Sequence, residues 1–306
     1  MYLCSYKKTN SMKYVVTGSL GNTAKPIVTQ LIEAGHRVTV VSSSKDKVKD
    51  IEAMGAHAAI GSVDDVSFLA ATFAGADAVY TMVPPKWDAA DWKESIHGIG
   101  KNYAAAIQQA GVKKVVNLSS VGAHMVDGCG PVTGLHRVEE ELNKLQGVDI
   151  KHLRPTFFFH NFMGNIGMIK HMGIIGGNYG DNTVMGMVHP NDIAAVAAEE
   201  LLGLSFTGHS VRYIASDERT LQEVAKVLGT AIGKPDLQWV NFKDDDARNG
   251  MVQAGLSAEV AANYAEMGHA IATGEMYADF NKHKPALGPT KLEAFAKEFA
   301  GAYAHS

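Results

Sequence analysis

The chain has 306 residues, of which 46% are hydrophobic and 20% charged, and its 28 basic and 32 acidic side chains give a formal net charge of −4. A chain of this size and composition buries a large core, which excludes disordered and fibrous proteins. The slight negative charge argues against nucleic-acid binding, because that activity needs a basic field to offset phosphate charge.

The amino-terminal segment lacks the apolar core and cleavage site of a secretory signal. We expect either a natural start at Met12 or a loose tail over residues 1–11, which leaves Cys4 without a function. Cys4 and Cys129 lie far apart in the chain, so we expect two free thiols in a reducing, cytoplasmic compartment. The sequence has no run of about 18 apolar residues, so we expect no membrane partner.

Short apolar runs alternate with helical patterns in the first half of the chain. The predicted strands cover 13–17, 37–41, 56–60, 78–82, 114–118 and 149–153. Helical periodicity covers 24–34 and 99–110, and Gly111 follows the second helix as a C-cap. This alternation predicts an α/β fold, a doubly wound parallel sheet with helices on both faces and right-handed crossovers.

The second half of the chain is less regular. Helices are predicted over 191–202, 220–232, 257–273 and 291–300, and strands over 211–215 and 237–242. Thr220 and Glu223 form a capping-box pattern at the start of one of these helices. We therefore expect one domain over 12–155 and a smaller, partly helical lobe over 156–306, with some of its elements returning to the first domain. The cleft between them is the expected ligand site.

A glycine pattern joins the first strand to the first helix, in the segment Gly18-Ser-Leu-Gly21-Asn-Thr-Ala24. Gly18 allows a tight turn, Gly21 lets the backbone approach a pyrophosphate, and Ala24 lets the helix pack close to the strand. The start of the helix then offers free N–H groups to phosphate. This strand–loop–helix context predicts a dinucleotide site, against the alternative of a tight turn with no ligand.

The second strand ends next to hydroxyl and lysine side chains instead of an acidic one. A carboxylate at this point holds the ribose 2′-hydroxyl of NAD, whereas Ser42, Ser43 and Lys47 suit a 2′-phosphate. We therefore expect NADP(H) in preference to NAD(H). Asp46 weakens the positive field, and the alternative is that these are ordinary loop residues.

Five further segments carry motifs that belong with the glycine loop. They are Met82-Val-Pro-Pro85, Asn117-Leu-Ser-Ser120, His136-Arg-Val-Glu-Glu140, Leu153-Arg-Pro155-Thr-Phe-Phe-Phe-His-Asn-Phe162 and Val188-His-Pro-Asn-Asp192-Ile-Ala. With the glycine loop, they resemble the NmrA-like group of atypical short-chain dehydrogenases over about residues 12–240. The resemblance implies a Rossmann domain with a small substrate lobe. It also implies quinone- or dye-reducing activity, or nucleotide sensing without turnover.

The resemblance also implies the cofactor contacts. The pyrophosphate loop would comprise Thr17, Gly18, Ser19, Leu20, Gly21, Asn22 and Thr23. The adenosine phosphate would lie near Ser42, Ser43 and Lys47, with Gly61 and Ser62 beside the adenine. Val83 and Pro84 would line the ribose, and Pro155, Thr156 and Phe157 would border the nicotinamide.

The Tyr-x-x-x-Lys dyad of short-chain dehydrogenases does not occur in this sequence, and His136 and Glu140 stand at its two positions. His136 either donates a proton, since imidazole titrates near neutrality, or is a helix residue without chemistry. Ser120 either orients a substrate carbonyl or caps the strand end. Quinones and dye cations accept hydride with little acid help, so orientation over the nicotinamide can suffice.

We therefore expect an NADPH-dependent oxidoreductase that needs no flavin or metal and passes hydride to a small aromatic substrate in the cleft. The alternative is an NADP(H)-sensing regulator without turnover; a homodimer is possible on either interpretation. Aromatic and sulfur side chains could line an adaptable pocket, although core packing suits most of them. They are Phe157, Phe158, Phe159, Phe162, Met163, Met168, Met172, Met185 and Met187. Trp87 and Trp92 either form a lid or pack onto the lobe, and no histidine pair has zinc-protease spacing.

Overall fold

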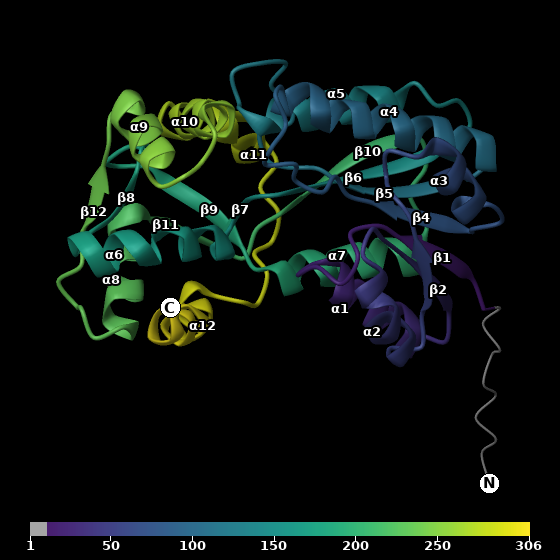
Figure 1. Ribbon diagram of the computed structural model, residues 1–306, viewed down its shortest axis with the longest axis horizontal. Helices are drawn as coiled ribbons and strands as arrows, with labels where there is room; N and C mark the ends of the chain where they lie inside the picture. The colour runs from purple at the N-terminus through teal and green to yellow at the C-terminus, as the bar shows by residue number, and fades with distance from the viewer. Residues whose placement is uncertain (1–10) are drawn as a thin grey trace, which may run out of the picture.

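The computed structural model describes residues 11–306, so Cys4 and the expected tail, apart from Ser11, lie outside the described residues (Figure 1). A seven-stranded parallel sheet forms the larger part of the molecule, in the order β10-β6-β5-β4-β1-β2-β3. Its strands are β1 (Lys13–Val16), β2 (Arg37–Ser42), β3 (His57–Ile60), β4 (Ala78–Thr81), β5 (Lys114–Leu118), β6 (Asp149–Pro155) and β10 (His209–Ile214). This Rossmann-type sheet confirms the predicted fold class.

Helices cover both faces of the sheet, which is why its inner strands are rich in valine and buried on both sides. The helices of one face are α1 (Ala24–Glu33), α2 (Val48–Ala53) and α7 (Pro190–Gly203). The helices of the other are α3 (Val66–Phe73), α4 (Trp92–Ala110) and α5 (Pro131–Asn143). Helix α4 begins at Trp92 instead of residue 99, because the Asp91 carboxylate accepts a hydrogen bond from the Glu94 N–H and caps it there.

Two small sheets and several helices build the rest of the molecule. One sheet contains β7 (Phe157–Phe158), β9 (Val184–Val188) and β11 (Asp217–Thr220), and the other contains β8 (Ile175–Gly177) and β12 (Trp239–Asn241). The helices are α6 (Ile166–Met172), α8 (Leu221–Ala231), α9 (Asp244–Gln253), α10 (Ala258–Ala272), α11 (Ala278–Lys282) and α12 (Leu292–His305). Two short 3₁₀ turns, η2 (Phe159–Asn165) and η3 (Glu275–Tyr277), belong to this part, whereas a third, η1 (Lys45–Lys47), lies between β2 and α2.

The polypeptide after residue 155 contributes to both parts of the molecule. Strand β10 pairs with β6 at the edge of the main sheet, and α7 packs beside α1. The predicted capping box at the start of α8 is confirmed, with Thr220 and Glu223 bonding reciprocally. Helix α12 extends to His305, beyond the predicted residue 300, and its Phe295 and Phe299 are buried in the lobe core.

Cys129 is a buried free thiol. Across residues 11–306, none of the helices combines the length and the apolar character that a membrane span requires.

Candidate functional site

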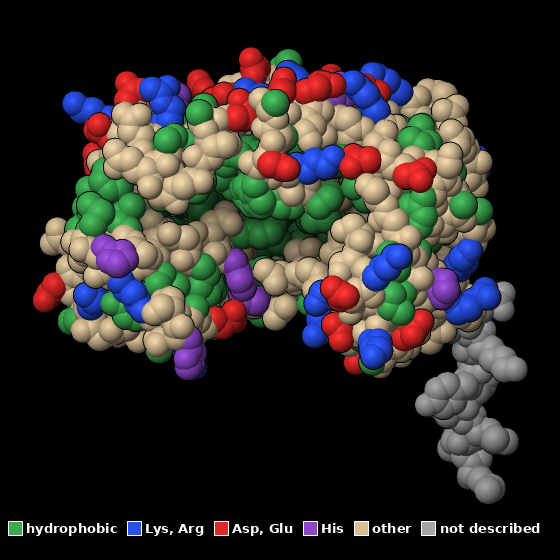
Figure 2. All heavy atoms as spheres, viewed as in Figure 1, with side chains coloured by type: hydrophobic (Ala, Val, Ile, Leu, Met, Phe, Trp, Pro, Cys, Tyr) green, Lys and Arg blue, Asp and Glu red, His purple; other side chains and the backbone are tan. Residues whose placement is uncertain are grey.

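The carboxyl ends of the parallel strands meet at one edge of the main sheet, facing the lobe (Figure 1). In this position an α/β sheet exposes its loops to a ligand. Figure 2 shows a hollow between the two parts of the molecule, and hydrophobic side chains line its wall.

The glycine loop after β1 adopts a conformation that demands glycine at its first position. Gly18 has a φ of 96°, and a Cβ atom there would lie 2.8 Å from Met82 Cγ. Ser19 also has a positive φ, 55°, which a non-glycine residue rarely adopts. Thr23 at the start of α1 makes no side-chain cap. The Lys25 N–H donates to the Gly21 carbonyl at 3.0 Å and Pro26 has no N–H, so the free N–H groups here are those of Asn22, Thr23 and Ala24. Free N–H groups and the helix dipole together suit an anion.

Thr17 fastens the glycine loop to the loop after β4. Its hydroxyl accepts a hydrogen bond from the Met82 N–H at 2.9 Å, and its own N–H donates to the Tyr80 carbonyl at 3.0 Å. The Tyr103 hydroxyl donates to the Met82 carbonyl at 2.7 Å. Thr17 is completely buried, so the structure places it behind the loop as its anchor.

Ser42, at the end of β2, is also engaged by protein groups. The Ser19 hydroxyl donates to the Ser42 hydroxyl oxygen at 2.9 Å, and the Ser44 N–H donates to the same oxygen at 3.2 Å. Ser42 is 3% exposed, whereas Ser43 and Lys47 are open to solvent. Lys47 lies 3.6 Å from Asp50, and both side chains are about half exposed, so the ion pair is weak and the ammonium group can be recruited.

The loops after β3 and β4 are connected to each other. Ser62 bonds with Asp64, and the Lys86 ammonium group pairs with the Asp64 carboxylate at 2.8 Å. A Cβ atom on Gly61 would lie 2.7 Å from the Phe68 ring, so only glycine lets this ring close beneath the loop. Val83 and Pro84 are partly exposed on the β4 side.

The ends of β5 and β6 lie side by side. The Ser119 N–H donates to the Leu153 carbonyl and the Val121 N–H to the Pro155 carbonyl, each at 2.8 Å. Pro155, Thr156 and Phe157 are all buried, and the Thr156 hydroxyl donates to the Ile214 carbonyl at 3.2 Å. Ser120 is half-buried between them. The structure therefore brings the residues predicted near the nicotinamide onto neighbouring strands.

His136 lies on α5 with both ring nitrogens turned toward protein. Its Nδ1–H donates to the Ala123 carbonyl at 2.9 Å, which leaves the lone pair on Nε2. Nε2 is buried without a hydrogen-bond partner and lies 3.6 Å from the Glu140 carboxylate, one helical turn along. The imidazole can take up a proton at Nε2, but this atom is not open to solvent.

A buried polar network at the β6 end of the sheet was not predicted from sequence. The Arg154 guanidinium binds the Glu139 carboxylate in bidentate fashion, at 3.0 and 2.6 Å, and also donates to the Tyr213 hydroxyl. Burial, and then a hydrogen bond to Asp279, raise the pKa of Tyr213 to about 12, so this hydroxyl stays protonated. Strand β6 carries Asp149, Lys151 and Arg154, and its sequence alone does not show that Arg154 pairs with Glu139 of α5.

His152 belongs to the same end of the sheet. Its Nδ1 accepts from the Asn117 amide at 3.1 Å and its Nε2–H donates to the Asn143 amide oxygen at 3.0 Å. Burial lowers the pKa of His152 to about 4. This imidazole is therefore neutral at physiological pH and structural.

Aromatic rings from distant segments pack together in the lobe core. Phe157 contacts Phe162 and Tyr179, with ring centroids 5.2 and 5.6 Å apart, and Tyr179 stacks on Trp239. Of the Phe and Met residues predicted for a pocket, Phe159, Phe162, Met185 and Met187 are fully buried core residues, whereas Met172 is exposed. Tyr179 was not predicted, because it stands alone in a glycine-rich segment.

The loop after β4 carries a second aromatic group. Trp87 is 53% exposed and lies against Trp92 and Tyr264, with centroids 5.3 and 6.1 Å away. Trp92 is buried and Tyr264 packs against both the sheet core and the lobe core. The group therefore joins the β4 loop to α10, and Trp87 is the most exposed of its three rings.

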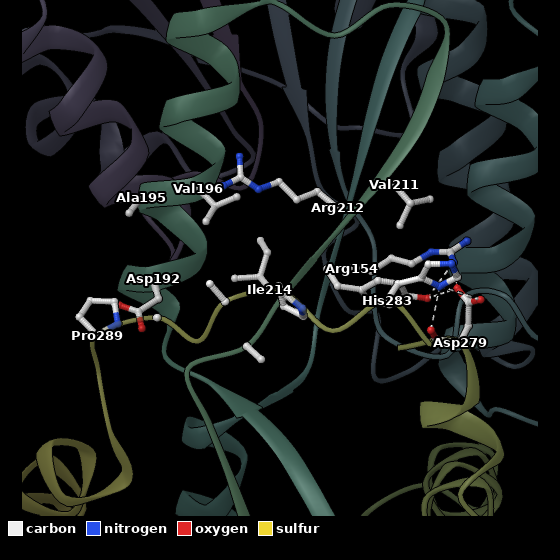
Figure 3. Close-up of a pocket in the computed structure, with 15 residues that line it drawn as sticks. Arg154, Asp192, Ala195, Val196, Val211, Arg212, Ile214, Asp279, His283 and Pro289 are labelled. Atoms are coloured by element: carbon white, nitrogen blue, oxygen red, sulfur yellow. Dashed lines mark hydrogen bonds and ion pairs between the residues drawn. The ribbon is translucent and has the colours of Figure 1, made fainter. Parts of the chain in front are cut away.

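A cavity of about 630 Å³ lies elsewhere, around the free edge of β10 (Figure 3). It contains none of the residues predicted to bind cofactor. Arg212 pairs with Glu199 and Glu200 at 3.0 and 2.8 Å, and Asp279 lies near both Arg154 and His283 (Figure 3). The cationic groups of this cavity are thus already neutralised, so it is a poor anion site.

Comparisons with known proteins identify relatives over most of the chain. A family model described as NAD(P)H-binding matches residues 18–203. The chain is 26% identical over 238 residues to the (4-alkanoyl-5-oxo-2,5-dihydrofuran-3-yl)methyl phosphate reductase of Streptomyces griseus, covering 78% of this chain and 80% of that one. It is 24% identical over 292 residues to the NAD(P)H azoreductase of Xenophilus azovorans, covering 95% and 97%.

Among solved structures, the triphenylmethane reductase of Citrobacter sp. complexed with NADP(H) is similar, with a TM-score of 0.78. The identity is 20%, and the superposition covers 94% of this chain and 99% of that one. At this identity the likeness shows the shared fold.

Proposed function

The chain belongs to the NAD(P)H-binding family, and on that premise we propose that it is an NADPH-dependent oxidoreductase that passes hydride to a small aromatic acceptor, such as a quinone or a dye. The observation that carries this proposal is the glycine loop in front of an uncapped helix, where Gly18 has no room for a Cβ atom. Such a cradle fits a pyrophosphate.

In the loop from Gly18 to Thr23, the pyrophosphate would be held by the backbone N–H groups that remain free, those of Leu20, Asn22 and Thr23. The Ser19 and Gly21 N–H groups already donate to the carbonyls of Val41 and Gly18. Bound NAD(P)H supplies a hydride to a nearby acceptor. Ser19 and Ser42 fix the loop through their mutual hydrogen bond, and Thr17 anchors it from behind. Pro155, Thr156 and Phe157 would limit the space beside the nicotinamide and keep water away from it.

Preference for NADPH is supported by charge. Ser43 and Lys47 are exposed at the end of β2, where a site for NAD carries a carboxylate. The Ser42 hydroxyl is occupied by Ser19 and Ser44, so the 2′-phosphate would be bound by Ser43 and Lys47.

An aromatic acceptor is supported by the apolar wall of the hollow and by the ring of Trp87, which is 53% exposed on the loop after β4. Such acceptors delocalise the incoming charge, which reduces the need for an acid. The azoreductase and the triphenylmethane reductase, named for dye substrates, are related to this chain or share its fold.

Ser120 and His136 are the candidate catalytic residues. Ser120 would orient the acceptor from the end of β5. His136 would be the proton donor to the reduced acceptor, which requires Nε2 to take up a proton first. Replacing either residue by alanine measures its contribution to kcat. An unchanged kcat for His136→Ala excludes the acid role. The matched control is Glu140→Ala, which keeps the imidazole.

A nucleotide-sensing regulator is the second candidate function. The observation that favours it is the buried Nε2 of His136, which leaves the position of the usual tyrosine without an open donor. On this hypothesis, nucleotide binding changes the loops after β3 and β4, joined by Lys86 and Asp64, and a partner protein reads the change.

The test is a fluorescence titration of the purified protein with NADPH and NADH, followed by a quinone, an azo dye and a triphenylmethane dye. We expect tighter binding of NADPH and its oxidation when an acceptor is added. Binding without oxidation by any acceptor contradicts the reductase and supports the sensor. No binding of either nucleotide contradicts both.

A further inference from the structure

Three metal-ligating side chains meet where the lobe joins the main sheet. His160 lies in η2, His189 caps the start of α7, and Glu298 lies on α12. One donor atom of each lies within 4.8 Å of the other two. We propose that these residues form a binding site for one divalent transition-metal ion of the zinc class. The proposal is independent of the reductase activity.

The distances suit such an ion. Glu298 oxygens lie 3.1 Å from Nε2 of His189 and 3.6 Å from Nε2 of His160. In a tetrahedral zinc site with bonds of about 2.1 Å, neighbouring ligand atoms are about 3.4 Å apart. The donor set is two imidazoles and one carboxylate, which zinc accepts together with a water molecule in the fourth position.

The two imidazole rings are held in place by neighbouring aromatic side chains. They lie edge to face with centroids 5.2 Å apart, and the His160 ring also contacts Phe295 at 5.4 Å. Phe295 stacks in turn on Phe159. His189 is 5% exposed at its side chain and Glu298 is 48% exposed, so the site is rigid on one side and open to an ion on the other.

His160 lacks any hydrogen-bond partner among residues 11–306. Its Nδ1 is buried without one, and its Nε2 is too far from Glu298 for a hydrogen bond. Of the two nitrogens only Nδ1 is buried, so the rule that buried polar groups are satisfied concerns Nδ1, whereas Nε2 is accessible and unpaired and is left free to bind an ion. An ion placed between His160, His189 and Glu298 would satisfy Nε2.

His189 must change its tautomer to bind the ion. Its Nδ1 now accepts a hydrogen bond from the Asn191 N–H at 3.1 Å, so the ring proton sits on Nε2 and points to Glu298. Coordination at Nε2 moves this proton to Nδ1 and ends the bond to Asn191. Loss of one helix cap lowers the affinity about fivefold relative to a site without this cost. Because the hydrogen bond from the Asn191 N–H is lost when the ion binds, exchange of this amide hydrogen reports on ion binding.

The experiment uses the full chain without a histidine tag or nucleotide. Zn²⁺ is titrated in competition with a chromophoric chelator, and Co²⁺ is followed by its visible absorption. We expect one ion per chain. His189→Asn retains a capping side chain but loses the imidazole, so it and Glu298→Gln should weaken binding at least about tenfold. His171→Asn, an exposed histidine on α6, is the matched control and should bind normally.

The proposal is overturned if the wild-type chain takes up no ion at micromolar concentration, or if His189→Asn and Glu298→Gln bind as tightly as His171→Asn. Should His189→Asn fail to fold, His160→Asn, at a more exposed position, replaces it. Hydrogen exchange gives a second readout, because the Asn191 N–H should exchange faster when Zn²⁺ is bound. An unchanged rate with the ion bound overturns the role of His189.

Discussion

The two ends of the main sheet use their polar groups in opposite ways. At the β1–β2 end, the loops are built from glycine and backbone, and the N–H groups at the start of α1 lack a capping side chain. At the β6–β10 end, charged side chains are buried and bind one another, as Arg154 does with Glu139. The first end leaves backbone N–H groups free for a ligand, whereas the polar side chains of the second end bind one another and stabilise the fold.

The two ends should therefore contribute to different properties, the first to nucleotide affinity and the second to the free energy of unfolding. A group already satisfied by protein partners gains little from a ligand, whereas a free N–H in a rigid loop gains a full interaction. Substitutions at the β1–β2 end should therefore change nucleotide affinity, and substitutions at the β6–β10 end should change the free energy of unfolding.

The largest effect is expected from Glu139→Ala. It leaves the Arg154 guanidinium buried without its carboxylate, which costs about 3 to 5 kcal/mol of unfolding free energy. Denaturant unfolding measures this loss, with Glu140→Ala, 62% exposed at its side chain, as the control on the same helix. The folded fraction should bind NADPH normally. Equal stability of the two variants would remove the contrast between the sheet ends.

The next effect depends on His152. Unfolded histidine binds a proton below about pH 6.5, but His152 in the folded chain binds one only near pH 4. The contribution of His152 is therefore complete above pH 6.5 and is lost as pH falls toward 4, by up to about 3 kcal/mol. Unfolding free energies measured between pH 7 and 4 should fall more steeply for the wild type than for His152→Gln. Parallel curves contradict the prediction.

At the other end of the sheet, Gly18→Ala should weaken NADPH binding at least about tenfold. The new Cβ atom meets Met82, and alanine is strained at this positive φ, which costs about 1 to 2 kcal/mol. Gly98→Ala is the matched control, because nothing lies within 4 Å of a Cβ atom there. Titration calorimetry compares the two, and equal affinities would show that the glycine loop does not bind the nucleotide.

A smaller effect is expected from Lys47→Ala, which removes the cation proposed to bind the 2′-phosphate. An exposed charge of this kind contributes about 1 kcal/mol, so NADPH affinity should fall about fivefold while NADH affinity is unchanged. Lys49→Ala, an exposed neighbour, serves as the control. If NADH affinity falls equally, Lys47 does not discriminate between the nucleotides.

The smallest effect concerns the acceptor. Trp87→Ala should raise KM for an aromatic acceptor two- to threefold, about 0.5 kcal/mol, because one exposed ring face is lost. Trp87→Phe should restore most of it, and the Kd for NADPH should not change. Steady-state kinetics with a quinone and a dye test this, and a KM insensitive to Trp87 places the acceptor elsewhere.

The strands of the first half were predictable because each needs only its own residues. Central strands of a parallel sheet are buried on both faces, so Val15, Val79 and Val116 belong to continuous apolar runs that fix the strands to within one or two residues. The glycine turn was predictable for the same reason, since its glycines and the following helix are contiguous. The family match over 18–203 confirms the NAD(P)H-binding family, and the residues that would contact the nucleotide stay predictions.

The remainder depends on residues far apart in the chain. Strands β7 and β8 have two and three residues, too few for any periodicity. The hydrogen bond from Ser19 to Ser42 spans 23 positions, and the pair of His189 and Glu298 spans 109. Neither spacing forms a motif, so only the fold reveals which hydroxyls are occupied and which histidines meet. The roles of Ser120 and His136 stay predictions.

The unequal exposure of the three tryptophans equips the protein with an intrinsic optical probe. Trp92 and Trp239 are each 4% exposed, whereas Trp87 is 53% exposed on the loop beside the predicted ribose contacts. Acrylamide or iodide should therefore quench the emission of Trp87 selectively, leaving the other two indoles bright. Movement of this loop can then be timed in a stopped-flow instrument without attaching a dye.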